Sequence, residues 1–188
     1  MKTLILILML LISIQLKSQC IIDSSKFFIW GNDIHMLLKD LPSNKDSFKN
    51  NVNVQLNTTI LFSFGYKENK LSFCILGVIK KEGSISNYID MSIENHESKH
   101  LDITELFARK LRAKIIEEIN NESSEIALIQ KSNSLYKKYN DSLLFFQEYY
   151  DRITDFGNNH YEQKKINEKI AADLDFLLLY KDPLIRTR

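Results

Sequence analysis

The sequence predicts an α+β fold, in which an N-terminal β-hairpin or small antiparallel sheet packs on three C-terminal helices. Alternating or densely apolar runs rich in β-branched residues lie before residue 82, and long stretches with apolar residues at helical spacing follow from about residue 93. Strands grouped before helices, rather than alternating with them, are typical of this class. The 188 residues suffice for one domain with its own hydrophobic core.

The composition is that of an ordinary globular protein. Its 25 Lys and Arg residues nearly balance 24 Asp and Glu residues, for a formal net charge of +1. Such a balance indicates neither nucleic acid nor an anionic membrane as a partner. With only five Gly and two Pro residues, the chain has the composition of neither a disordered nor a fibrous protein.

Residues 1–18 have the layout of a secretory signal peptide. Lys2 precedes the mainly apolar run LILILMLLISIQL, small or polar residues follow, and cleavage after Ser18 is expected. A membrane anchor is the weaker interpretation, because the run is shorter than the ~20 residues that span a bilayer. We therefore expect a mature chain of residues 19–188, secreted or periplasmic, with no stable membrane span.

The two cysteines leave two possibilities open. In an oxidising compartment Cys20 and Cys74 could form a disulfide. Cys74 also lies within an apolar strand pattern, where a lone buried thiol is common. Cys20 does not follow the small residue that precedes a lipidated cysteine, so lipidation is not expected.

The first half of the chain predicts strands and one short helix. The run KFFIW predicts a short strand, DIHMLLKDL one or two helical turns, and the polar PSNKDSFKNN a loop. His35, in the helical turns, is expected to be a surface or partly buried residue. A hairpin is predicted between Val52 and Lys81, where alternating and β-branched apolar residues flank the polar turn KEN.

The second half predicts three helices. The stretch IENHESKHLDITELFARKLRAKIIEEI contains no Gly or Pro, and the polar NNESSE follows it. A second helical stretch runs to TDFGNN, and the third, HYEQKKINEKIAADLDFLLLY, ends near Pro183. We expect the Lys and Arg residues that follow His100 to form a solvated face of the first helix.

The first of these helices carries the pattern His-Glu-x-x-His. Residues four apart share a helix face, so His96 and His100 can direct both imidazoles at one metal ion, and Glu97 beside them can act as a general base on a water molecule. Both histidines fall within the apolar stripe of this helix. They could instead be buried structural residues with ordinary hydrogen-bond partners. Two adjacent imidazoles are costly to bury unless something organises them, and this favours the metal site.

A zinc site of this kind needs a third protein ligand. No glycine interrupts the helix after His100, so a third histidine close by, as in metzincins, is excluded. Glu105 falls about 180° away from His96 and cannot reach the same ion. The ligand must then come from a later element, as it does in gluzincins, which makes this a zincin-like helix. The candidates are Glu148, Asp151 and His160.

Two blocks of the sequence resemble a known family. The segment HESKHLDITELFARKLR is similar to the HE-x-x-H-x-D-I-x-E-x-x-A-R-x-L segment of the bacterial domain of unknown function 922, whose members are described as predicted secreted zinc-dependent proteases. YDRITDFGNNHYEQKKINEKIAADL resembles the family's second block. The matching residues are Tyr150, Asp151, Thr154, Gly157, Gln163, Ile170 and Leu174. Trp30 and the secretion signal also fit, and the likeness spans roughly residues 27–175.

One departure from the family bears on the third ligand. Phe156 stands where the family often has a histidine. If that histidine is the family's ligand, this chain lacks it unless His160 substitutes. If Asp151 is the ligand, the site is intact, and the resemblance makes Asp151 the first choice.

These observations predict an exported zinc-dependent hydrolase, and specifically a metallopeptidase acting on a peptide or protein substrate. His96 and His100 would bind Zn²⁺, Asp151 or His160 would complete the site, and Glu97 would activate water. The alternative is a non-catalytic secreted binding or accessory protein with a structural or vestigial metal site. A metal-free helical domain is the third possibility.

Overall fold

The computed structural model describes residues 20, 22–31, 34–43, 54–67, 69–87 and 91–187. The predicted signal peptide, the side chain of His35 and most of the loop after Pro42 lie outside the described residues. In chain order the elements are β1 (Phe27–Ile29), α2 (Ile34–Asp40), β2 (Val54–Lys67), β3 (Lys70–Ser86), α3 (Met91–Asn121), α4 (Glu125–Thr154), α5 (His160–Phe176), the 3₁₀ helix η2 (Leu178–Tyr180) and β4 (Leu184–Arg186). The α+β prediction is confirmed, with three long helices after the hairpin.

The sheet is built around the hairpin of β2 and β3. These strands pair antiparallel from Lys67 with Lys70 to Val54 with Ser86, with an irregularity between Gln55 and Asn57. β1 and β4 pair with the other edge of β3. β4 is absent from the sequence-based expectation, because a three-residue strand is too short to show an alternating pattern.

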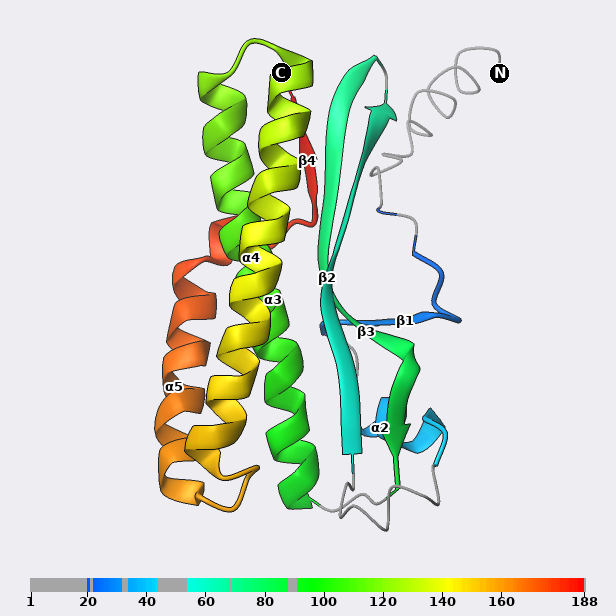
Figure 1. The fold of residues 1–188 in the computed structure, drawn as a ribbon, viewed down its shortest axis with the longest axis vertical. Helices are drawn as coiled ribbons and strands as arrows, with labels where there is room; N and C mark the ends of the chain where they lie inside the picture. Colours follow the sequence, from blue (N-terminus) through cyan, green and yellow to red (C-terminus); the bar gives the residue numbers. More distant parts are fainter. Residues whose placement is uncertain are drawn as a thin grey trace, which may run out of the picture.

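The three long helices lie together on one side of the hairpin, whereas β1 and α2 lie on its other side (Figure 1). α3 contacts β2, β3, α4 and α5, and it is therefore the central element of the packing. The main core gathers apolar side chains from the sheet and all three helices, including Ile60, Phe73, Ile75, Ile103, Leu111, Leu143, Tyr150 and Ile170. Among the described residues, no helix combines the length and apolarity needed to cross a membrane.

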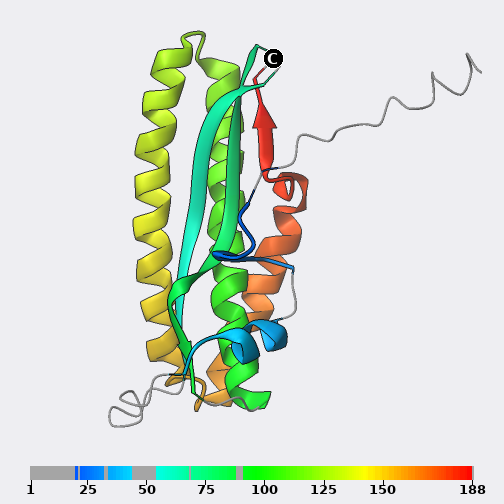
Figure 2. The same ribbon diagram turned by 90° about the vertical axis from the view of Figure 1, so that its right-hand side faces the viewer.

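A smaller core fixes the first turns of α3 from the opposite side of the sheet. Leu37, Leu38 and Leu41 pack with Ile79 and Leu101, and α2 lies at the level of the N-terminal half of α3 (Figures 1 and 2). Trp30 packs against this cluster, and its indole N–H donates to the carboxylate of Asp102 over 2.9 Å. The part of α3 that carries the two histidines is thus held from two directions.

The arginines of α3 correct the expectation of a solvated face. Arg109 and Arg112 are buried, and both donate to the Oε1 of the buried Glu105. Arg109 also donates to the carbonyl of Leu174 over 2.7 Å, and Arg112 to the carbonyl of Ile75 over 2.8 Å. Residues at i, i+4 and i+7 share one helix face, and this face packs between β3 and α5. The sequence pattern does not reveal it, because isolated charged residues usually mark a solvated surface.

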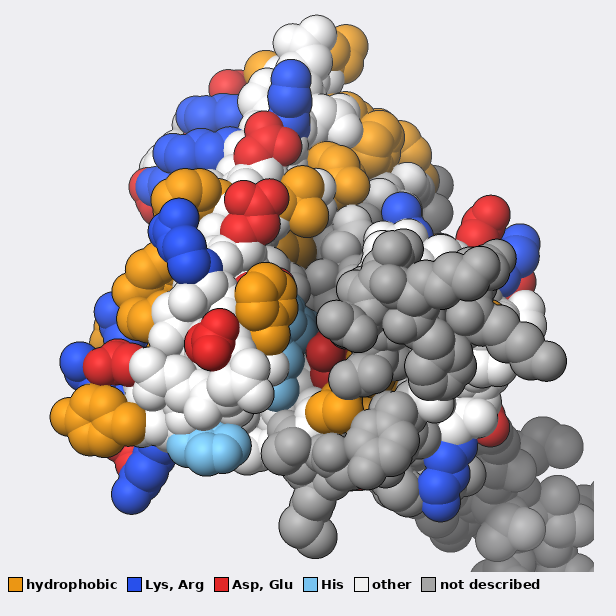
Figure 3. Space-filling view, turned by 60° about the horizontal axis from the view of Figure 1, so that its bottom comes forward, with side chains coloured by type: hydrophobic (Ala, Val, Ile, Leu, Met, Phe, Trp, Pro, Cys, Tyr) orange, Lys and Arg blue, Asp and Glu red, His pale blue; other side chains and the backbone are white. Residues whose placement is uncertain are grey.

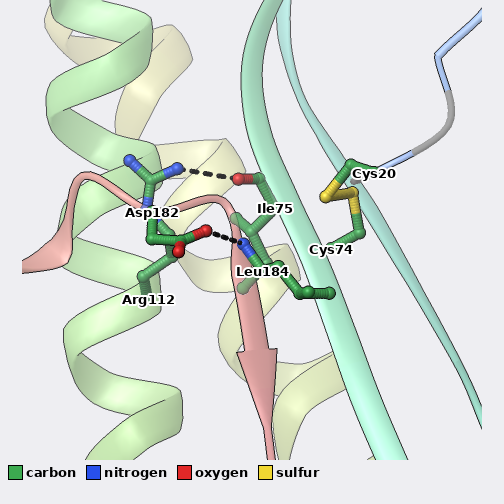
Figure 4. Close-up of a disulfide and its surroundings, with 6 residues drawn as sticks. All are labelled: Cys20, Cys74, Ile75, Arg112, Asp182 and Leu184. Atoms are coloured by element: carbon green, nitrogen blue, oxygen red, sulfur yellow. Dashed lines mark hydrogen bonds between the residues drawn. A yellow bond between two sulfur atoms is a disulfide. The ribbon is translucent and has the colours of Figure 1, made fainter. Parts of the chain in front are cut away.

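A disulfide links Cys20 to Cys74 of β3 (Figure 4). The same figure shows Arg112 donating to the carbonyl of Ile75 and the backbone N–H of Leu184 donating to Asp182 over 3.0 Å. The disulfide resolves the alternative that the sequence left open for the two cysteines. It attaches the start of the described chain to the central strand.

Candidate metal centre

The two histidines of α3 meet an acidic residue of α4. The Nε2 atoms of His96 and His100 are 3.4 Å apart, and Oδ1 of Asp151 lies 3.1 Å from the first and 2.9 Å from the second. Three atoms from two helices therefore converge on a single point. Of the candidate third ligands, Asp151 is the one brought into contact with both imidazoles.

The antiparallel pairing of α3 and α4 produces this convergence. A connection of three residues joins the two helices. Because each helix rises by ~1.5 Å per residue, residues at about the same distance from this connection lie at the same height and face each other. His96 accordingly faces Asp151, and His100 faces Gln147. Because α4 ends at Thr154, Asp151 lies in the last turn of this helix.

Tyr150 forms the apolar wall of the site. Its buried ring stacks on His96, with centroids 4.9 Å apart, and meets His100 edge-on at 5.4 Å. Its hydroxyl donates to Oδ1 of Asn167 in α5 over 3.2 Å. The ring restricts the rotation of both imidazoles, and the hydrogen bond connects the site to α5.

Gln147 sets the tautomer of His100. Its amide nitrogen donates to the hydroxyls of Thr58, over 2.7 Å, and Thr104, over 3.0 Å. The amide oxygen therefore faces Nδ1 of His100 and accepts its N–H. In the neutral imidazole this leaves a lone pair on Nε2, pointing at Asp151. Histidines that bind metals through Nε2 are oriented in this way in many proteins.

The contact between His100 and Asp151 needs a positive charge, which a proton or a metal ion can supply. A lone pair on Nε2 of His100 facing a carboxylate oxygen at 2.9 Å is repulsive unless a proton or a metal ion lies between them. Ligands bound at ~2.0–2.1 Å around a tetrahedral ion are about 3.3 Å apart. The observed separations of 2.9, 3.1 and 3.4 Å match that spacing within a few tenths of an ångström.

The electrostatics of the site favour positive charge beside Asp151. Burial on its own would raise the pKa of the Asp151 carboxyl, but hydrogen bonds from His100 and His96 outweigh it and hold that pKa well below its usual range. Burial likewise opposes protonation of His100, yet the bond to Asp151 and the charge of Glu97 raise its pKa above the ordinary value. Positive charge on the imidazole beside Asp151 is therefore favoured.

Glu97 lies next to this point with an altered acidity. One carboxylate oxygen of Glu97 and one ring nitrogen from each histidine all lie within 4.8 Å of one another. Burial raises the pKa of Glu97, the two histidines lower it, and the charge of Asp151 raises it further, for a net increase. A carboxylate of raised pKa at this distance can accept a proton from a water molecule held between it and the histidines.

The site opens into a hollow of about 1130 Å³ between the start of α3, the end of α4 and the lower part of β2. Polar residues of β2 line it together with the apolar residues Val54, Leu56, Ile93, Leu144 and Phe156. Figure 3 looks onto this end of the molecule, and histidine side chains are visible in the hollow beside acidic and apolar ones. The Glu97 carboxylate is therefore accessible to a ligand.

The other predicted site residues are not part of this convergence. Glu148 is exposed on the wall of the hollow. His160 is exposed at the start of α5 and lines a separate hollow of about 490 Å³ with Asn95 and Lys164, so the structure does not bring it to the two imidazoles. Phe156 is 73% exposed and lines the main hollow. Glu105 faces the buried arginines, as its angle on the helix requires.

Sequence reasoning did not identify Gln147 and Thr58 as parts of the site. Gln147 precedes Asp151 by one helical turn, so the sequence places both residues on the same face of the helix. Thr58 comes from β2, and its role depends on how the hairpin packs against α3 and α4. No local pattern marks such a residue.

The buried His96 and His100 and the half-buried Glu97 could together hold a metal ion, and Asp151 lies against both imidazoles. A scan of protein-family models, a search of curated proteins and a search of solved structures found no match to this chain.

Proposed function

We propose that the protein is an exported zinc-dependent hydrolase, a metallopeptidase in which His96, His100 and Asp151 hold Zn²⁺. The observation that carries the proposal is the convergence of two imidazole nitrogens and a carboxylate oxygen, with the lone pair of the neutral His100 ring directed by Gln147. Two imidazoles and a carboxylate are a donor set that suits zinc, and three protein ligands leave a position open for water or substrate.

In this proposal each residue has a defined task. Bound zinc would polarise a substrate carbonyl and lower the pKa of a water molecule to about 7. Glu97, which lies beside both imidazoles, would take the proton of that water as it attacks the carbonyl carbon. Tyr150 and Gln147 keep the two imidazoles in place.

The hollow supports a peptide as the substrate. Its volume of about 1130 Å³ exceeds what a single small molecule needs, and it combines apolar side chains with polar groups of β2. Leu144 and Phe156, both exposed apolar residues on its wall, would contact an apolar side chain of the substrate.

Two further observations support export and the family resemblance. A disulfide between Cys20 and Cys74 is favoured in oxidising compartments and agrees with the predicted signal peptide. Asp151, the residue that the resemblance to the domain of unknown function 922 favours as a ligand, lies against both histidines. Membership in that family stays a prediction.

The experiment combines metal analysis with three variants of the mature protein. We expect one zinc per wild-type chain by mass spectrometry and cleavage of unstructured peptides. Glu97→Gln should keep the metal and lose cleavage by about 10²-fold or more, because the general base is removed. His96→Ala should lose both. Glu148→Gln, which changes an exposed carboxylate on the same hollow, should retain both. Absence of stoichiometric metal from the wild type would contradict the proposal.

A non-catalytic accessory protein with a structural metal site is the second candidate. The exposed Phe156, which replaces a histidine of the resembling family, favours it. Here Glu97→Gln would leave every measured property unchanged while His96→Ala still released the metal. The two candidates therefore differ in the result for one variant.

A further inference from the structure

Two buried polar atoms at the site have no hydrogen-bond partner among the described residues. One is Nδ1 of His96, and the other is the amide oxygen of Gln163 in α5. Both side chains are buried, at 4% exposure each. An unpaired polar atom in a protein interior costs free energy, and native structures leave few of them.

The two atoms flank the same glycine. A Cβ on Gly157 would lie 3.3 Å from Cβ and 3.4 Å from Cγ of His96, and 3.5 Å from the amide oxygen of Gln163. Nδ1 is bonded to that Cγ, so the imidazole and the amide both border the space beside Gly157. Gly157, at a φ of 91°, adopts a left-handed conformation that glycine tolerates best.

The other histidine already has the corresponding contact. Nδ1 of His100 donates to the amide oxygen of Gln147, which directs Nε2 toward Asp151. His96 directs Nε2 to the same carboxylate oxygen and lacks only the matching acceptor. Gln163 offers the same chemical group from the next helix.

We propose that, on metal binding, Gln163 positions His96 by accepting the N–H of Nδ1, a hydrogen bond that the present structure does not contain but that would parallel the one between Gln147 and His100. Gln163 is a positioning residue in this assignment, because it acts on the metal through the imidazole. Fixing the N–H on Nδ1 leaves the lone pair of Nε2 free for the ion. The inference rests on the proposed metal site and adds the residue that completes it.

The packing alternative predicts a different behaviour. If Gln163 only fills space, replacing its amide by a group of similar size should affect the stability of α5 and leave metal affinity unchanged. If it positions His96, the affinity should fall by about 10–100-fold, which is typical when such outer contacts are lost.

The test measures zinc affinity by competition with a chelator, together with thermal unfolding of the metal-free protein. We expect Gln163→Met to weaken zinc binding by about 10–100-fold, to an extent similar to Gln147→Met. Gln163→Glu, which keeps an acceptor, should restore binding to within a few-fold of wild type. Ile166→Val removes a buried methyl group from the same helix and serves as the control for packing. It should lower the unfolding temperature and leave zinc affinity unchanged.

A measurement on the wild-type protein tests the same assignment without relying on a variant that folds. In nitrogen-15 spectra of the zinc-loaded protein, we expect the Nδ1 protons of both histidines to be slow to exchange with solvent. An Nδ1 proton of His96 that exchanges freely would overturn the assignment, as would wild-type zinc affinity in Gln163→Met. If the wild type binds no zinc, the proposed function and this inference both fail. If it binds zinc but Glu97→Gln has no effect, catalysis alone is refuted.

Discussion

At the scale of single residues, the site depends on hydrogen-bond partners more than on the metal-binding pattern itself. Any helix with histidines four apart can bring two imidazoles together. What distinguishes His100 is an acceptor on Nδ1, held in orientation by the hydroxyls of Thr58 and Thr104. An imidazole without such a partner samples both tautomers, and one of them has no lone pair on Nε2.

Phe156 is the residue with the least favourable backbone conformation at the site. Its φ of 51° lies in the left-handed region, and its side chain is 73% exposed. A bulky residue in that region costs roughly 1–2 kcal/mol, and little burial offsets it here. Strain of this kind, held by surrounding contacts, often accompanies a functional role, which is consistent with a contact between this ring and the substrate.

We predict that Phe156→Asn raises the free energy of unfolding by about 0.5–1 kcal/mol, because Asn adopts the left-handed conformation at a lower cost. Urea unfolding measures the change. Phe145→Asn is the matched control, since Phe145 is 69% exposed and lies within α4. That substitution relieves no left-handed strain and should leave stability equal or slightly lower. If the two substitutions changed the free energy of unfolding equally, the backbone strain at Phe156 would be refuted.

At the scale of elements, the position of α3 on the sheet determines where the histidines lie. The backbone of α3 at Thr104 and Glu105 packs directly on Gly77 of β3. The candidate metal centre lies one helical turn and more toward the N-terminus of α3, so a displacement of the helix at this point would also displace His100 relative to Thr58 and Gln147.

Gly77→Ala should therefore destabilise the protein by about 1–3 kcal/mol, the usual range for overpacking. The added Cβ would lie 2.8 Å from the backbone nitrogen of Glu105 and 3.0 Å from the carbonyl carbon of Thr104, and neither can move without moving α3. We also expect weaker metal binding. Gly65→Ala, on β2 with nothing within 4 Å of the new Cβ, is the control and should be neutral or stabilising. Chemical denaturation of both variants provides the comparison.

At the scale of the whole molecule, buried charge connects layers that apolar packing alone would not align. Glu105 accepts hydrogen bonds from Arg109 and Arg112, which in turn bind the carbonyls of Leu174 and Ile75. One carboxylate thus links α3 to α5 and to the central strand. Burial lowers the pKa of Arg112, while the charge of Glu105 opposes that decrease, so the network depends on this one acidic residue.

We predict that Glu105→Leu destabilises the fold by about 3–5 kcal/mol, because it leaves two buried guanidinium groups without a counter-charge. The free energy of unfolding by urea tests the prediction. Glu117→Gln on the same helix removes an exposed carboxylate that pairs with Lys114, and it should change stability by less than about 1 kcal/mol. Similar losses in the two variants would mean that the buried network contributes no more than a surface ion pair.

Much of the fold was predictable because its signals are local. The hairpin and the three long helices follow from periodicity, and their observed bounds lie close to the predicted ranges. β4 and the burial of Arg109 and Arg112 were not predictable, since both depend on partners far away in the chain. For the disulfide, the sequence named the pair, because Cys20 and Cys74 are the two cysteines of the chain, but it did not decide whether the bond forms across 54 residues.

By itself, the sequence determined that His96, Glu97 and His100 share one end of a helix, since a helix places residues four apart on one face. It also limited the third partner to Glu148, Asp151 or His160. Only the tertiary structure decided among them. The antiparallel pairing of α3 and α4 brings Asp151 against both imidazoles, leaves Glu148 on the wall of the hollow and directs His160 to another surface. That choice depends on the register between two helices, which no short stretch of sequence contains.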